Sequence, residues 1–398
     1  MFTNVSLRGG TSIASFLALT IILVITLSGC SNEMEIDRIN FPVALGIDFD
    51  ETNNKIKIYA QVSVASSNTS FQTTQSTEKK FKVLEGQGDT LLDAMENAVD
   101  KGLQHISWKH VMVVVFTTKM AKHGIQNELD LLWRISQVHV NGKLMITDDN
   151  LKELLESKPK IESSMPTALA GIDLISRQST DTKPITIKDF TMAYLSDGMA
   201  PILPRVFMIK GENKEIDIDY VGLGVFKNDK LIGNLSADET RGAISIFGMK
   251  TNGSFTIPYS RNSKDNKITI RSVTTRPEII PMLQKNNLSI TIKLDTEYKI
   301  RQISMSKKMD TAEEEKINKL VESYIKKNAE ATVYKVQKKF HSDIFGFGEK
   351  VYRKYPEYWN KNKRNWNNIF PNVAINVEVK ADLKNTGELL NSIEYSKD

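Results

Sequence analysis

Apolar and polar positions alternate with the period of a β-strand in two stretches after residue 40. FPVALGIDFD (41–50) and KIKIYAQVSV (55–64) flank the turn-rich segment DETNN, and this arrangement predicts a β-hairpin. Residues 63–80 hold nine Ser or Thr in eighteen positions, which is typical of a solvated loop. KKFKVLEG (79–86) then predicts a further strand.

The period changes to that of a helix after residue 88. Asp89 is the expected N-cap of a helix whose apolar positions, Leu91 to Leu103, recur at helical spacing. HVMVVVF (110–116) is a continuous apolar run and predicts a strand buried on both faces. IQNELDLLWRI (125–135) and LKELLES (151–157) predict amphipathic helices, the second capped by Asp148 or Asp149.

The second half of the chain is richer in strand patterns. DIDYVGLGVFKNDKLIGNLS (217–236) predicts a hairpin with an Asn-Asp turn. Three more segments have a strand-like pattern: GAISIFGM (242–249), KITIRSV (267–273) and LSITIKLDTEYKI (288–300). Thr311 and Glu314 have capping-box spacing and open a predicted helix over 312–340.

These patterns predict an α+β protein, multi-domain and mixed α/β, with about three small sheet-plus-helix domains after a cleaved signal peptide. The main boundary falls in the Gly-, Pro- and charge-rich segment 196–215. The expected division is a signal peptide over 1–29 and domains over 30–205, 215–280 and 285–398.

An apolar segment near the N-terminus carries the clearest functional signal. Ile13 to Leu27 is an uncharged run of fifteen residues that follows Arg8. It is short for a membrane span, which needs about 20 residues, and has the length of a signal-peptide core. Leu27-Ser28-Gly29-Cys30 follows it and resembles the lipobox of bacterial lipoproteins. We therefore expect cleavage before Cys30 and diacylglyceryl modification of its thiol; the alternative is a short membrane anchor with an incidental cysteine.

Composition excludes several classes of protein. Hydrophobic residues make up 40% and charged residues 25% of the chain, and the net charge is +5, so the chain is an ordinary globular protein without the basic excess of a nucleic-acid binder. A single cysteine excludes an internal disulfide and a redox pair. No GxSxG, GxxxxGK[ST] or HExxH motif occurs. We expect no enzymatic activity, no metal and no cofactor, and we interpret Asp48 and Asp50 as turn residues rather than an acid/base pair.

Residues 340–370 combine aromatic and basic side chains. Between Lys335 and Arg364 there are nine Lys or Arg against three acids. Two interpretations are open: the aromatic residues are core and the basic ones a solvated face, or the region binds a protein partner or anionic headgroups. The second interpretation names as contact residues Tyr358, Trp359, Trp366, Lys361, Lys363 and Arg364.

Several motifs together resemble the Ger(x)C family, the lipoprotein C subunits of spore germinant receptors. The resemblance begins at the lipobox and continues through VALGIDFD, His110 with VMVVVF, and YVGLGVFKNDKLIGNL followed by ETRG (239–242). It ends with DIFGFG (343–348), YPEYW (355–359), Trp366 and the strand pattern over 373–380. Each motif is weak alone, but their order and spacing are specific.

The resemblance implies a non-enzymatic subunit, acylated on the outer face of the cytoplasmic membrane and located in the spore inner membrane. It implies as partners the integral-membrane A and B subunits of a nutrient receptor, with no nucleic acid and no direct binding of small molecules. It supplies no catalytic or ligand-binding residue beyond Cys30. The alternative is a lipid-anchored protein that binds a small nutrient in a cleft.

Overall fold

The structure, a computed structural model, describes residues 39–63, 81–100, 105–135, 138–211, 216–260, 263–303 and 310–385, together with Phe16, Leu19 and Thr20. Apart from these three residues, the predicted signal peptide lies outside the described residues, as do the lipobox with Cys30 and most of the Ser/Thr-rich segment. Described residues from Asn40 onward belong to one compact unit.

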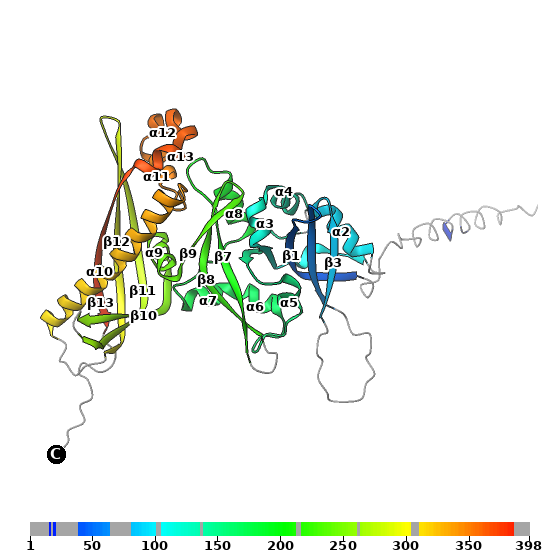
Figure 1. Cartoon of the computed structure of the whole chain (residues 1–398), viewed down its shortest axis with the longest axis horizontal. Helices are drawn as coiled ribbons and strands as arrows, with labels where there is room; N and C mark the ends of the chain where they lie inside the picture. Colours follow the sequence, from blue (N-terminus) through cyan, green and yellow to red (C-terminus); the bar gives the residue numbers. More distant parts are fainter. Residues whose placement is uncertain are drawn as a thin grey trace, which may run out of the picture. The chain divides into compact units, whose positions relative to one another are not determined.

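Two β-sheets organise this unit (Figure 1). Among the described residues, the larger sheet has the order β3-β2-β1-β5-β6-β7-β8-β9, with β4 beside β1. Its strands are β1 (Ile39–Asp50), β2 (Lys55–Ser63), β3 (Phe81–Gly88), β4 (His105–Ile106), β5 (Val113–Thr117), β6 (Lys143–Thr147), β7 (Ile202–Lys210), β8 (Ile216–Lys227) and β9 (Lys230–Leu235). Strands β1, β5, β6 and β7 are neighbours in this order, and each pair among them is parallel. The pairs β3–β2, β2–β1, β7–β8 and β8–β9 are antiparallel.

Helices cover both faces of the parallel strands, which explains the continuous apolar run of β5. Val113 and Val115 pack with one hydrophobic cluster and Val114 and Phe116 with another, and all four are fully buried. The helices of this half are α2 (Leu91–Asp100), α3 (Thr118–His123), α4 (Gln126–Arg134), α5 (Leu151–Glu156), α6 (Met165–Ala170), α7 (Ile172–Gln178) and α8 (Ile187–Tyr194), with a 3-10 turn η2 (Trp108–His110). The predicted strand buried on both faces is therefore confirmed.

The second sheet has the order β10-β11-β12-β13. Its strands are β10 (Lys250–Ser260), β11 (Ser263–Gln284), β12 (Asn287–Ile303) and β13 (Ala374–Asn385); β12 and β13 are parallel and the other pairs antiparallel. Helix α10 (Thr311–Tyr334) runs along this sheet (Figure 1). The other elements of this half are α9 (Ala237–Phe247), a π-helical turn η4 (Lys335–Lys339), α11 (Phe347–Lys354), α12 (Pro356–Asn362), η5 (Lys363–Asn365), α13 (Trp366–Ile369) and η6 (Phe370–Asn372).

The predicted α+β class, both hairpins and the long helix are confirmed. One element is wrong: GAISIFGM belongs to helix α9 rather than to a strand. Ser236 caps this helix in a capping box with Glu239, and Gly248 ends it with a φ of 74°. Its apolar run is continuous because α9 packs against both α10 and β11.

Three expected N-caps are wrong by one residue. Thr90 instead of Asp89 caps α2, since the Asp93 backbone N–H donates to the Thr90 hydroxyl at 3.1 Å. Asn150 caps α5 and Asp310 caps α10. In each case the residue with the best geometry is a neighbour of equal capping ability.

The sheets also bear on the predicted domain limits. Position 205 lies inside β7, whose only register pair with β6 is Ile146 with Arg205. The segment 280–285 is the tip of the hairpin between β11 and β12, which pair along 15 matched positions. The predicted boundary between 215–280 and 285–398 therefore falls at a hairpin tip within one sheet, and the division of the chain into three domains stays a prediction.

Candidate functional site

The DIFGFG segment folds around one buried carboxylate, that of Asp343, which is 3% exposed. Backbone N–H groups of Phe345 and Phe347 donate to its Oδ1 at 3.2 and 3.1 Å. The Gly348 N–H and the Trp366 Nε1–H donate to its Oδ2 at 2.9 and 3.1 Å. Burial raises the pKa of Asp343 to about 6, while these four hydrogen bonds favour the ionised form. The motif is therefore a structural turn organised by a charge.

This turn docks on the segment that precedes β7. The Ala200 N–H donates to the Asp343 carbonyl at 2.7 Å, and the Ser342 hydroxyl donates to the Phe226 carbonyl at 2.7 Å. A Cβ on Gly348 would lie 2.6 Å from Gly198 Cα, so only glycine allows the two backbones to meet. The motif thereby joins the second half of the chain to the first.

The predicted aromatic contact surface needs correction. Trp359 and Trp366 are 5% and 2% exposed, and their rings meet edge to face at 5.3 Å. They are core residues and cannot serve as exposed contacts. The Trp366 indole packs against Phe370 and donates to Asp343, and the Trp359 ring packs against Trp366.

The remaining predicted contact residues stay accessible. Tyr358 is half-buried, Lys361 and Arg364 are exposed, and Lys363 Nζ lies 3.0 Å from an Asp197 carboxylate oxygen. Contact of these four residues with a partner remains a prediction. Cys30 lies outside the described residues.

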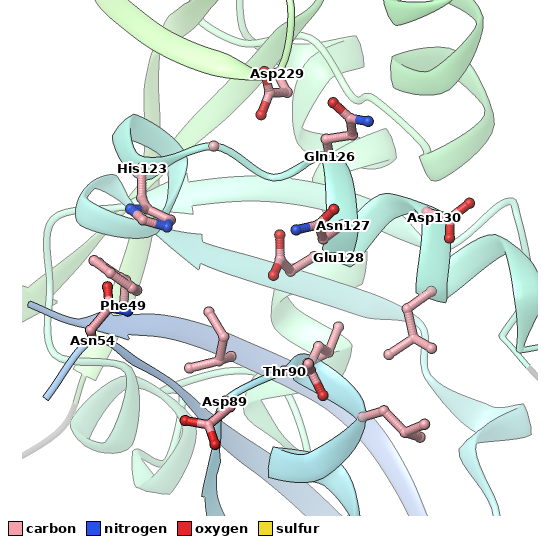
Figure 2. A pocket seen from close by; sticks show the side chains of 15 residues that line it. Phe49, Asn54, Asp89, Thr90, His123, Gln126, Asn127, Glu128, Asp130 and Asp229 are labelled. Atoms are coloured by element: carbon pink, nitrogen blue, oxygen red, sulfur yellow. The ribbon is translucent and has the colours of Figure 1, made fainter.

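The structure also contains a cleft of about 550 Å³ that the sequence did not predict (Figure 2). Fifteen residues line it, from β1 and the β1–β2 turn, the start of α2, the α3–α4 segment and the β8–β9 turn. The acidic members are Asp89, Glu128, Asp130 and Asp229. The lining of the cleft is therefore acidic.

Aromatic and apolar side chains form part of its wall. The Phe49 ring stacks on the His123 imidazole with centroids 3.7 Å apart. Gly124 has a φ of 124°, and a Cβ there would lie 2.5 Å from Asp229 Oδ2. The Ile125 N–H donates to the Asp229 carbonyl at 3.2 Å. This glycine thus lets the β8–β9 turn bring Asp229 into the cleft.

Glu128 is the most unusual of these residues. It is 5% exposed, and its carboxylate projects into the cleft (Figure 2). Burial raises the pKa of Glu128 to about 7, and the nearby charge of Asp229 adds to the rise. Among the described residues its only hydrogen-bond donor is its own backbone N–H, and no basic side chain pairs with it. The sequence does contain a signal for the burial of Glu128, because this residue shares the apolar face of its helix with Ile125 and Leu132.

Asp48 and Asp50 have structural roles. The Thr117 hydroxyl donates to Asp48 Oδ1 at 2.6 Å. Lys57 Nζ lies 2.7 Å from Asp50 Oδ2, and this hydrogen bond lowers the pKa of Asp50. Within the described ranges, no group of three or more His, Cys, Asp or Glu side chains is arranged to hold a metal ion, and no helix has the length and apolarity to cross a bilayer.

Two family models match the sequence in succession. The model described as spore germination protein N-terminal domain matches residues 32–208, and the one described as spore germination B3/GerAC like, C-terminal, matches residues 221–387. Together they account for nearly all of the chain after the lipobox. The chain belongs to the GerAC-like family of spore germination proteins.

Relatives of this GerAC-like chain match it almost end to end. Spore germination protein KC of Bacillus subtilis is 24% identical, with 95% of this chain and 97% of the relative covered. Spore germination protein B3 of the same organism is 22% identical, with 94% and 98% covered. The crystal structure of the GerBC protein shares the fold, with a TM-score of 0.55 at 19% identity, over 86% of this chain and 98% of GerBC.

The acidic cleft of this GerAC-like protein uses both matched regions. Phe49, His123 and Glu128 belong to the N-terminal region, and Asp229 belongs to the C-terminal one. Packing between the two regions is therefore what assembles the cleft.

Proposed function

We propose that this chain is the C subunit of a nutrient germinant receptor, anchored to the outer face of the cytoplasmic membrane by a diacylglyceryl group on Cys30. In the spore this places it at the inner membrane. The proposal rests on one combination of facts. The chain belongs to a spore germination family, and its single cysteine is the last residue of a lipobox. The acyl chains anchor through burial of CH₂ groups, each contributing about 0.8 kcal/mol.

The subunit acts without catalysis, through contacts with the integral-membrane A and B subunits. Such a subunit transmits a signal only if its contact free energy differs between the dormant and signalling states of the complex. The accessible Tyr358, Lys361, Lys363 and Arg364 offer an aromatic and basic surface for these contacts. Lys363 already pairs with Asp197, so Lys361 and Arg364 are the freer cations.

A second candidate function is capture of a small nutrient by a lipid-anchored protein. The acidic cleft around Glu128 favours it, because its volume of about 550 Å³ lies within the range of small-molecule sites. The two functions predict different effects on germination when the lipid anchor is removed.

Cys30→Ala in a sporulating host tests the proposal, with membrane retention and nutrient-triggered germination followed together. We expect both to be lost, because without the thiol no diacylglycerol attaches and the chain leaves the membrane. Ser31→Ala, which leaves the lipobox intact, is the matched control and should keep both.

Two results would contradict the proposal. Normal membrane retention of Cys30→Ala would show that the lipobox is not the anchor. Loss from the membrane with normal germination would remove the receptor role and favour nutrient capture.

A further inference from the structure

We propose that the cleft formed by β1, the start of α2, the α3–α4 segment and the β8–β9 turn binds a small organic ammonium ion, with Glu128 and Asp229 as its anionic acceptors. The site goes beyond the receptor role and does not depend on it. It departs from the sequence-based expectation that the chain binds no small molecule directly.

The Glu128 carboxylate has few hydrogen-bond donors among the described residues. Glu128 is a buried residue, and a buried carboxylate is costly to ionise unless a cation or several donors compensate it. Asp343 shows the compensated case in this same chain, with four donors on its oxygens. Within the part of the chain that the structure describes, the Glu128 carboxylate accepts a hydrogen bond from its own backbone N–H alone. Its carboxylate oxygens, which can accept further hydrogen bonds, face the cleft (Figure 2).

The other carboxylates of the cleft narrow the position of the ligand. Asp130 Oδ2 lies 2.6 Å from Arg134 Nε, and Asp89 Oδ1 lies 3.7 Å from Lys55 Nζ. These two rim residues already have cationic partners. Asp229, by contrast, is close enough for its charge to raise the pKa of Glu128, and a cation between the two carboxylates would relieve that repulsion.

The lining favours an organic ammonium over a bare metal ion. Ile56, Leu91 and Leu131 supply apolar wall, which a metal ion cannot use and an alkyl group can. The stacked Phe49 and His123 rings form an aromatic surface of the kind that attracts alkylammonium groups. Among the described residues no cluster has the donors of a metal site. Amide groups of Asn54 and Asn127 at the same cleft offer additional acceptors for ammonium N–H groups.

Calorimetric titration of the whole chain in detergent tests the proposal, with n-butylammonium chloride as the probe. We expect n-butylammonium to bind, and uncharged n-butanol and potassium chloride not to. Glu128→Gln, which keeps shape and removes the charge, should weaken binding about tenfold or more, the loss expected for a charge-assisted hydrogen bond. Asp130→Asn, at the rim and paired with Arg134, should change affinity less than about twofold.

The pH dependence supplies a second readout. The other titratable side chains that line the cleft are Asp229 of the β8–β9 turn, His123 of α3, Asp89 before α2 and Asp130 of the same helix as Glu128; at the rim, Lys55 pairs with Asp89 and Arg134 with Asp130. The ligand binds ionised Glu128, so with a pKa of about 7 the affinity should rise about tenfold between pH 6 and pH 8. The alkylammonium stays charged over this range, as lysine does. Glu128→Gln should lose this dependence.

Several outcomes would overturn the proposal. They are no binding of n-butylammonium to the wild-type chain, equal binding by folded Glu128→Gln, or equally tight binding of potassium. Tighter binding of Nα-acetyl-lysine amide than of n-butylammonium would make a partner's lysine the occupant instead of a free ion. If Glu128→Gln fails to fold, Asp229→Asn in the β8–β9 turn provides the same comparison.

Discussion

At the scale of single residues, two buried carboxylates of this chain differ in how their charge is compensated. Asp343 receives four hydrogen bonds from a turn and an indole, whereas Glu128 receives one from its own backbone. The difference separates a residue that holds the fold from one that is available to a ligand. Sequence alone could place Asp343 in a motif but could not count its donors, because three of them depend on the turn closing.

Asp343→Ala should lower the free energy of unfolding by about 3–5 kcal/mol, because it leaves three backbone N–H groups and the Trp366 indole N–H buried without an acceptor. Denaturant unfolding followed by fluorescence measures the change. Asp382→Ala, which removes an exposed ion pair with Lys380, is the control and should cost less than about 1 kcal/mol. Equal effects of the two substitutions would show that the Asp343 turn is not a stabilising centre.

At the scale of elements, most of the secondary structure followed from hydrophobic period, and the one wrong element is instructive. GAISIFGM has the apolar density of a strand, but Ser236 and Glu239 form a capping box and Gly248 provides a left-handed C-cap. These capping signals lie at the two ends of the helix, and the spacing of apolar residues within a short segment does not include them. Helix α9 is apolar on more than one side, and Gly242 lets one of these sides approach α10 closely. A Cβ there would lie 2.3 Å from the Asn328 carbonyl oxygen.

The sign of the change in the free energy of unfolding caused by Gly242→Ala therefore tests whether α9 packs closely on α10. In a helix that packs on nothing, this substitution stabilises by up to about 1 kcal/mol. Here the added Cβ meets the backbone of α10, and we expect a loss of about 1–3 kcal/mol in the free energy of unfolding, measured by urea denaturation. Ser245→Ala on the same helix should change stability by less than about 1 kcal/mol. A stabilising effect of Gly242→Ala would contradict the close packing of α9 on α10.

At the scale of the whole molecule, sequence predicted the class of fold but not how its halves are joined. The Gly-, Pro- and charge-rich segment 196–215 predicted the main domain boundary, yet its first residues include Gly198 and Ala200, on which the Asp343 turn docks. A close backbone contact requires the same small residues as a flexible loop, so composition cannot separate the two. The cleft was missed for a related reason, since Glu128 and Asp229 are about a hundred residues apart and meet only in the folded chain.

The most direct test of the receptor role is co-isolation. The tagged wild-type chain would be cross-linked in spore inner membranes, solubilised and purified, and its partners identified by mass spectrometry. We predict recovery of the A and B subunits of one receptor. The double reversal Lys361→Glu and Arg364→Glu should reduce recovery severalfold, and Lys319→Glu with Lys326→Glu on α10 should not. A wild-type chain that is membrane-bound and supports germination, yet recovers neither subunit, would contradict the account.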